Sequence, residues 1–159
     1  MTQKKLSKYL CFIVYFLALA GLFCIFVLAP KVGLSMAGKY QRFSHLYYPA
    51  LMFIWVCAVP FYLGLYAAYL IGKDIGRDKS FSKINSDRLR KIGIYCVMES
   101  VLIFISIVSL VVIRVLNPFL LLILILLSLT VVALSVICFA LSHLVMKAAR
   151  LQEENDLTI

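Results

Sequence analysis

Glu99 is the residue whose setting most suggests chemistry, because it is the sole acidic side chain inside the long apolar stretches of this 159-residue chain. It follows Lys91 by eight residues, which is about 12 Å along a helix and near the middle of a hydrocarbon core of about 30 Å. A carboxylate at that depth costs roughly 3 kcal/mol, so burial favours the neutral acid. The candidate hydrogen-bonding partners at matching depth are Tyr62, Ser135 and the backbone carbonyl that Pro60 leaves free in the second apolar stretch.

Two interpretations of Glu99 follow from this position. The first is a polar clasp, in which the carboxyl group hydrogen-bonds across the helix bundle. The alternative is transport, because intramembrane acids often mark ion or proton pathways. The clasp is favoured, since one carboxyl group without further polar residues along a path is weak support for a transporter.

The other reactive side chains form no recognisable site. Five cysteines lie singly within apolar stretches, with no pair at a metal-binding or redox spacing, so we interpret them as small packing residues. His45 and His143 are expected on opposite sides of a membrane and cannot cooperate within one chain. We therefore expect no catalytic residues, no metal, no cofactor and no enzymatic activity.

Four apolar stretches must position these residues. The chain is 64% hydrophobic and 14% charged, against about 45–50% and 25% in soluble domains. Each stretch exceeds the roughly 20 residues that cross a bilayer as a helix. We predict an all-α integral membrane four-helix bundle, antiparallel and up-down, as a single domain over residues 1–159. The predicted helices are 9–29, 47–71, 92–113 and 119–145.

The positive charges predict the orientation. Twelve of the 16 Lys and Arg residues fall in the N-terminal segment, the loop 72–91 and the tail 146–159, and four fall on the other side, where we expect the outer loop Pro30–Leu46. The cation-rich side is expected to be cytoplasmic, which puts both termini there. Near anionic headgroups each cation contributes about 1 kcal/mol, so we expect membrane lipid, and no nucleic acid, as the direct partner of these charges.

The loop 72–91 and the tail 146–159 are the two segments that suggest a protein partner. The loop carries apolar Phe81 among its cations, and Asn85 or Ser86 is predicted to cap the third helix. The fourth helix is expected to run on past the membrane into an acidic cluster that ends in apolar residues. The candidate docking residues are Phe81, Asn85, Glu153, Glu154, Asn155, Asp156, Leu157 and Ile159.

The last nine residues, LQEENDLTI, closely resemble the closing motif of the bacterial family called domain of unknown function 2975 (DUF2975). The loop is similar to the same family through Gly76, Phe81-Ser82, Asn85, Leu89 and Ile92-Gly93. Members of this family are uncharacterised four-span membrane proteins of bacteria, and their genes often neighbour a small helix-turn-helix transcription regulator of the Cro/CI kind. The resemblance implies a bacterial cell membrane location and suggests a regulatory partner.

The expected function is that of a non-enzymatic membrane partner of such a small helix-turn-helix regulator, bound through the loop and the tail. Two alternatives stay open: a small dimeric transporter that uses Glu99, and a membrane immunity or stress protein. Gly64 and Ala68 show a small-xxx-small spacing, which suits a packed bundle and a homodimer equally.

Overall fold

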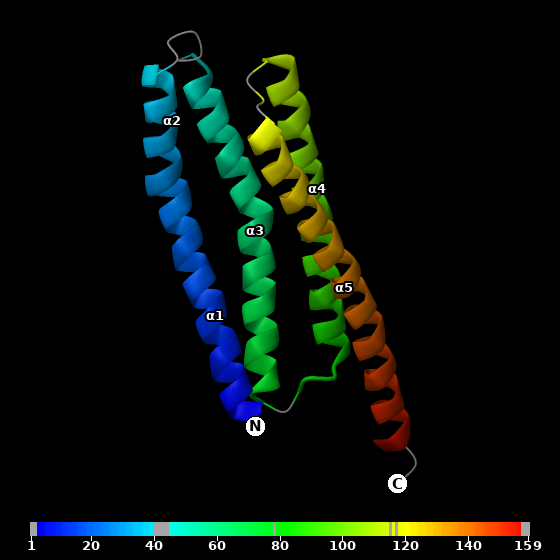
Figure 1. The fold of residues 1–159 in the computed structure, drawn as a ribbon. Helices are drawn as coiled ribbons and strands as arrows, with labels where there is room; N and C mark the ends of the chain where they lie inside the picture. Colours follow the sequence, from blue (N-terminus) through cyan, green and yellow to red (C-terminus); the bar gives the residue numbers. More distant parts are fainter. Residues whose placement is uncertain (1–2, 40–44, 78, 115, 117, 157–159) are drawn as a thin grey trace.

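The computed structural model describes residues 3–39, 45–77, 79–114, 116 and 118–156, and nearly all of them are helical. The elements are α1 (Gln3–Phe23), the π-helical turn η1 (Cys24–Leu28), α2 (Ala29–Lys39), α3 (Tyr47–Ile75), α4 (Lys83–Val112) and α5 (Pro118–Asp156) (Figure 1). Four helices are long and apolar enough to cross a membrane, the first being α1, η1 and most of α2 in continuous succession. This confirms the predicted all-α, four-span class.

The first helix continues to Lys39, whereas we predicted a loop from Pro30 onward, and that prediction is wrong. Proline lacks the N–H that an α-helix needs and crowds the preceding turn. Here the turn before it is π-helical, and the N–H of Ala29 donates to the carbonyl of Cys24, five residues back. Such a wider turn absorbs the change in hydrogen bonding without ending the helix.

The connection between α3 and α4 is also shorter than the predicted loop 72–91, because α3 runs to Ile75 and α4 begins at Lys83. The residue that caps α4 is Ser82, whose hydroxyl accepts the N–H of Asn85 at 3.2 Å. The predicted caps, Asn85 and Ser86, instead lie in the first turn and are both buried. Hydropathy detects the part of a helix that lies in lipid. It does not detect polar turns of the same helix that lie outside the membrane, so the start of α4 was predicted too late.

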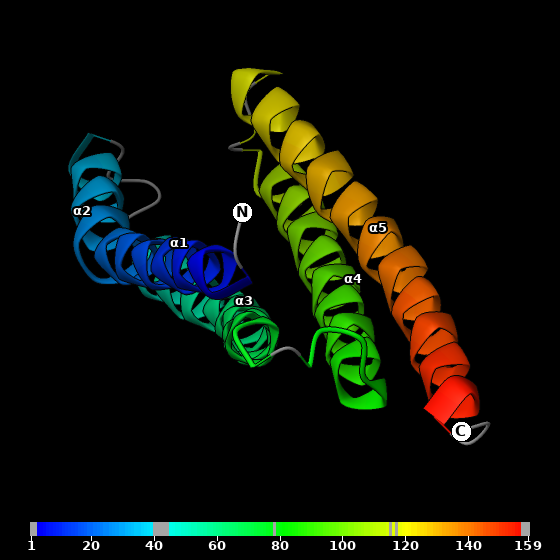
Figure 2. The same cartoon turned by 90° about the horizontal axis from the view of Figure 1, so that it is seen from below.

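The helices contact one another in the order of the chain. α1 packs on α3, α3 on α4, and α4 on α5, with the closest association between α4 and α5 (Figures 1 and 2). Among the described residues, α1 makes no close backbone contact with α4 or α5, and α3 makes none with α5. The antiparallel up-down arrangement is therefore an open one, in which the first and last helices do not meet.

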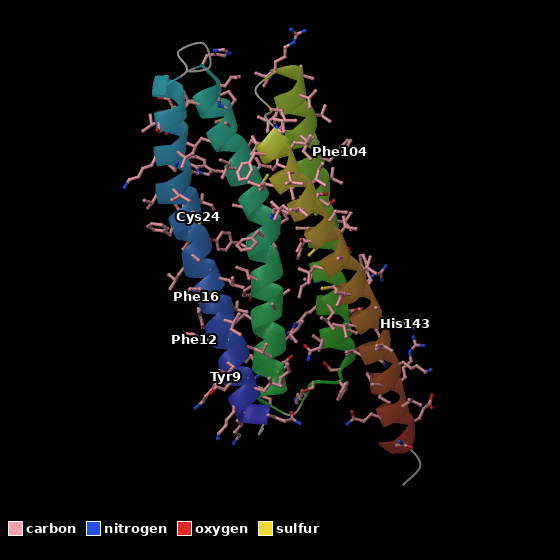
Figure 3. The ribbon with its side chains drawn as sticks, viewed as in Figure 1. Tyr9, Phe12, Phe16, Cys24, Phe104 and His143 are labelled. Carbon is pink, nitrogen blue, oxygen red and sulfur yellow. The ribbon has the colours of Figure 1, made fainter. Side chains whose placement is uncertain are left out.

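Few side chains are buried between these helices. Among the described residues, the buried apolar side chains are Pro60, Ala67, Ile103, Cys138 and Ala149, and the buried polar residues are Asn85, Ser86, Ser135 and Ser142. Large side chains such as Phe12 and Phe16 project outward from α1 (Figure 3) and are more than 60% exposed. Lipid tails are as apolar as these side chains, so helices in a membrane associate through close packing and hydrogen bonds rather than through apolar burial.

Both described ends of the chain lie at the same end of the molecule (Figure 1). We call this end, formed by residues 3–8, 72–77, 79–91 and 146–156, the terminus end. Two contacts tie its three segments together. The hydroxyl of Ser7 donates to the carbonyl of Gly72 at 2.7 Å, and Lys83 forms an ion pair with Glu153 at 2.8 Å.

Candidate functional site

Glu99 lies on the side of α4 that faces α3. It follows Arg88 by eleven residues, which is close to three helical turns, and Arg88 forms an ion pair with Asp74 of α3. The Oε2 atom of Glu99 is buried and has no hydrogen-bond partner among the described residues. An unpaired buried carboxyl oxygen is costly, so this position is the most unusual one in the spans.

The two predicted partners of Glu99 hydrogen-bond elsewhere. The hydroxyl of Tyr62 donates to the carbonyl of Ala18 at 2.9 Å and so joins α3 to α1. The hydroxyl of Ser135 donates to the carbonyl of Gly93 at 3.0 Å and so joins α5 to α4. The Oε2 atom of Glu99 hydrogen-bonds to neither hydroxyl, so the predicted clasp through Tyr62 and Ser135 is wrong. Equal depth in the membrane does not fix the direction in which a helix presents a side chain.

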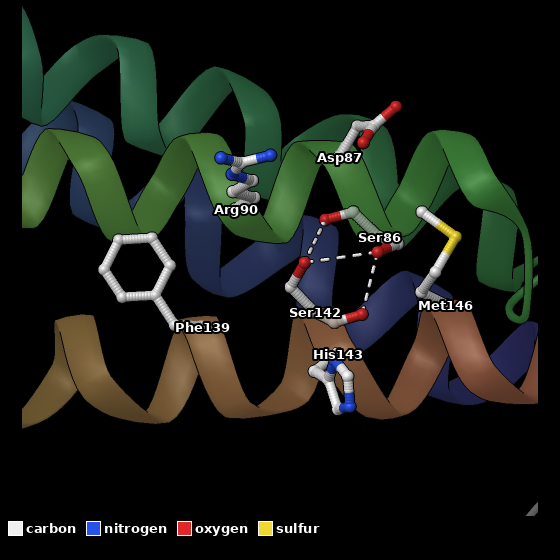
Figure 4. Close-up of a pocket in the computed structure, with 7 residues that line it drawn as sticks. All are labelled: Ser86, Asp87, Arg90, Phe139, Ser142, His143 and Met146. Atoms are coloured by element: carbon white, nitrogen blue, oxygen red, sulfur yellow. Dashed lines mark hydrogen bonds between the residues drawn. The ribbon is translucent and has the colours of Figure 1, made fainter.

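A reciprocal serine pair holds α4 and α5 together near the terminus end. The hydroxyl of Ser86 donates to the carbonyl of Ser142 at 2.7 Å, and that of Ser142 lies 2.8 Å from the carbonyl of Ser86 (Figure 4). The two hydroxyl oxygens lie 3.1 Å apart. Every polar atom of these buried side chains is therefore satisfied within the pair.

The serine pair begins a ladder of small residues that the sequence interpretation missed. On α4 the ladder continues through Gly93 to Ser100, and on α5 through Ser135 to Ser128, at a spacing of seven residues on both helices. A seven-residue repeat keeps one seam facing its partner helix, and small residues let the two backbones approach closely. The repeat is present in the sequence and was the signal that could have found this seam.

Asn85, one of the predicted docking residues, is a structural residue. Its side-chain N–H group donates to the carbonyl of Lys79 at 2.9 Å, and its side-chain oxygen accepts from Arg88 at 2.9 Å. Arg88 also binds Asp74. The side chain of Asn85 is only 1% exposed, so it fixes the α3–α4 connection from inside and offers nothing to a partner.

The other docking candidates divide into exposed residues and residues outside the described range. Phe81 is 60% exposed just before α4, and Ile84 in the first turn of α4 is 62% exposed. Glu153 pairs with Lys83, and both side chains are more than half exposed. Glu154 and Asn155 are exposed near the end of α5, which closes at Asp156, and Leu157 and Ile159 lie outside the described residues. We call Phe81, Lys83, Ile84, Glu153 and Glu154 the docking surface.

One family model matches most of the chain. The family model described as a protein of unknown function, DUF2975, matches residues 31–159. A 73-residue stretch is 34% identical to the uncharacterized membrane protein YoaS of Bacillus subtilis (strain 168), and it covers 46% of this chain and 44% of that protein. The match thus spans less than half of either protein. No solved structure matches the chain.

Proposed function

The chain belongs to the DUF2975 family of proteins of unknown function, and we propose that it is a non-enzymatic membrane protein that docks a cytosolic partner at its terminus end. The observation that carries this proposal is the ion pair between Lys83 and Glu153. It joins the first residue of α4 to the acidic end of α5, so two segments far apart in the sequence contribute to one surface.

The composition of the docking surface suits a protein partner. Phe81 and Ile84 supply exposed apolar groups. Lys83 lies between them in the sequence and pairs with Glu153, and Glu154 follows Glu153 on α5. Aromatic groups surrounded by polar side chains are typical of protein interfaces, where a few such anchors carry most of the binding energy. Asn85 and Arg88 support this surface from beneath by fixing the connection to α3.

We propose that the terminus end is cytoplasmic, because it carries twelve of the 16 cations and cytoplasmic segments are enriched in Lys and Arg. The partner we propose is a small helix-turn-helix transcription regulator, as the family resemblance suggests. The chain would then hold the regulator at the membrane of a bacterial cell, and release would change transcription.

A crosslinking capture from native membranes tests the docking proposal. We expect the full chain to capture a small DNA-binding protein. A chain truncated after Leu151 lacks Glu153 and Glu154, and we expect it to capture none. The substitution Phe81→Ala should also abolish capture. Its matched control is Phe119→Ala, because Phe119 is 72% exposed at the opposite end of the molecule. Equal capture by the truncated chain, or capture of no DNA-binding protein by the full chain, would contradict the proposal.

The unpaired Oε2 atom of Glu99 favours a second candidate function, proton-coupled transport by a dimer. Here Glu99 would take up and release a proton as α3 and α4 shift against each other. Flux in vesicles that hold the purified chain should be lost in Glu99→Gln and retained in Glu99→Asp. Absence of proton-coupled flux in the unsubstituted chain would exclude this candidate and leave the docking proposal untouched.

A further inference from the structure

A groove runs along the α4–α5 seam on the side away from α3. It consists of two cavities of about 280 and 350 Å³ that share Phe139. The first lies at the terminus end and the second lies deeper in the membrane, where Val97 and Val101 line it on α4. Each of these valines is two residues from Glu99 in the sequence. Two residues correspond to about 200° of rotation, so the valines lie on the side of α4 opposite Glu99. Since Glu99 faces α3, the groove opens toward lipid.

The deeper half of the groove is an apolar trough. Its walls are Val97 and Val101 on α4 and Val132 and Val136 on α5, all between 44% and 62% exposed. Ser135 forms part of its floor, and its hydroxyl is already bound to the carbonyl of Gly93. Short side chains on both helices leave a shallow channel whose surface is mostly hydrocarbon, with Ser100 as the other polar residue that lines it.

The half at the terminus end has a charged mouth. Asp87 and Arg90 line it from α4, and His143 lines it from α5 (Figure 4). Ser86 and Ser142 also line this cavity, but their hydroxyls are used by each other. Within the described part of the chain, neither Asp87 nor Arg90 takes part in an ion pair, since the pairs there are Lys83–Glu153 and Arg88–Asp74. The mouth therefore offers one cation, one anion and an imidazole to a ligand.

We propose that this groove is a binding site for a phospholipid whose headgroup carries both a phosphate and a primary ammonium, the chemistry of phosphatidylethanolamine. The phosphate binds Arg90, the ammonium binds Asp87, and one acyl chain passes Phe139 and lies between the valines. From Arg90 to Val101 the helix rises about 17 Å, which matches one leaflet, about half of a 30 Å hydrocarbon core. The charges and the trough thus lie at the depths where such a lipid has its headgroup and its chain.

Charge complementarity selects this headgroup over the others. An anionic headgroup without an ammonium places negative charge beside Asp87, where it is repelled. A choline headgroup has a cation but no N–H to donate, so it forms no charge-assisted hydrogen bond with the carboxylate. The ethanolamine headgroup satisfies Arg90 and Asp87 together. This site does not depend on the docking surface, because none of the residues that line the groove belongs to it.

Native mass spectrometry of the full chain in detergent micelles, with equal amounts of dioleoyl phosphatidylethanolamine, phosphatidylglycerol and phosphatidylcholine, tests the proposal. We expect phosphatidylethanolamine to be retained most strongly. Losing one charge-assisted contact in Arg90→Gln or Asp87→Asn should weaken its binding by about tenfold or more. Filling the trough with Val136→Phe should weaken it similarly.

Two controls separate the site from general lipid contact. Lys91→Gln removes an exposed cation next to Arg90 that does not line the groove, and Val59→Phe enlarges a valine of α3 that is 57% exposed. Both should bind phosphatidylethanolamine as the unsubstituted chain does. Equal retention of the three lipids, preference for phosphatidylglycerol, or unchanged binding in both Arg90→Gln and Asp87→Asn would overturn the proposal. So would a crosslink between two copies through Val136→Cys in native membranes, because a second chain would then fill the groove.

Discussion

Helix α4 forms a seam with α5 on one side and a seam with α3 on the other, and the two seams differ in their buried polar atoms. In the α4–α5 seam, the hydroxyls of Ser86, Ser142 and Ser135 are all hydrogen-bonded across the helices. In the α3–α4 seam, the Oε2 atom of Glu99 is buried with no partner among the described residues. The seam with α5 thus satisfies the hydroxyls of its three buried serines, and the seam with α3 leaves one buried carboxyl oxygen unsatisfied.

We infer from this difference that the seam serines stabilise the fold and that Glu99 does not. Helices in lipid are held by close packing and by hydrogen bonds between them, which is what the serine ladder supplies. An unpaired acid in the same environment costs free energy, and the buried Oε2 atom of Glu99 forms no hydrogen bond in return. We therefore interpret the α4–α5 pair as the structural scaffold, and Glu99 as the candidate functional residue within the membrane.

Adding a methyl group to the α4–α5 seam should have the largest effect. A Cβ atom at Gly93 would lie 2.9–3.1 Å from three ring carbons of Phe139, so Gly93→Ala should destabilise the protein by about 1–3 kcal/mol through overpacking. Gly64 of α3 has no neighbour within 4 Å of such an atom, and Gly64→Ala should stabilise its helix by up to about 1 kcal/mol. Denaturation in detergent micelles measures both; equal effects would mean that the ladder is not tightly packed.

Removing one hydroxyl from the serine pair should have an intermediate effect. Ser142→Ala leaves the buried Ser86 hydroxyl with fewer partners and should cost about 1 kcal/mol. The control is Ser109→Ala, because the Ser109 hydroxyl is exposed and binds the carbonyl of Ile105 within its own helix. We expect almost no change in the control. If Ser109→Ala lowers stability as much as Ser142→Ala does, the prediction is contradicted. Hydroxyls in the seam would then contribute no more to stability than hydroxyls on the surface.

The ion pair at the terminus end should contribute least to stability. Lys83 and Glu153 are 55% and 57% exposed, so Lys83→Gln should cost at most about 0.5 kcal/mol, and less at high salt. The same denaturation measurement at low and high salt checks this. A larger loss of stability that does not depend on salt would contradict this expectation. It would show that the end of α5 stabilises the fold and does more than contribute to the docking surface.

The existence of the four spans was predictable because hydropathy over about 20 residues is a strong signal, but the ends of the helices were not. Pro30 was taken as the end of the first helix, although the π-helical turn before it lets the helix continue. The third span was predicted from residue 92 and its cap at Asn85 or Ser86, although the Ser82 cap starts α4 three to four residues earlier. Both errors come from using apolar character as a measure of helical structure.

Within the candidate site, the type and depth of Glu99 were predictable and its surroundings were not. Tyr62 and Ser135 were chosen by depth, yet the direction of a side chain depends on the rotation of its helix. A one-residue change in register turns that direction by about 100°. The seven-residue spacing of Ser86, Gly93 and Ser100 does carry information on rotation. It identifies the α4–α5 seam, and it leaves Glu99 on another face of α4.

The most direct test of the comparison is the stability of Glu99→Leu beside Ser142→Ala, measured by denaturation of the purified chain in detergent micelles. If Glu99 contributes nothing to the fold, replacing its unpaired carboxyl group with an apolar side chain of similar size should leave stability unchanged or raise it by about 1–3 kcal/mol. Ser142→Ala should lower it under the same conditions. A loss of stability in Glu99→Leu equal to or greater than that in Ser142→Ala would contradict this account, because Glu99 would then be a structural partner of α3.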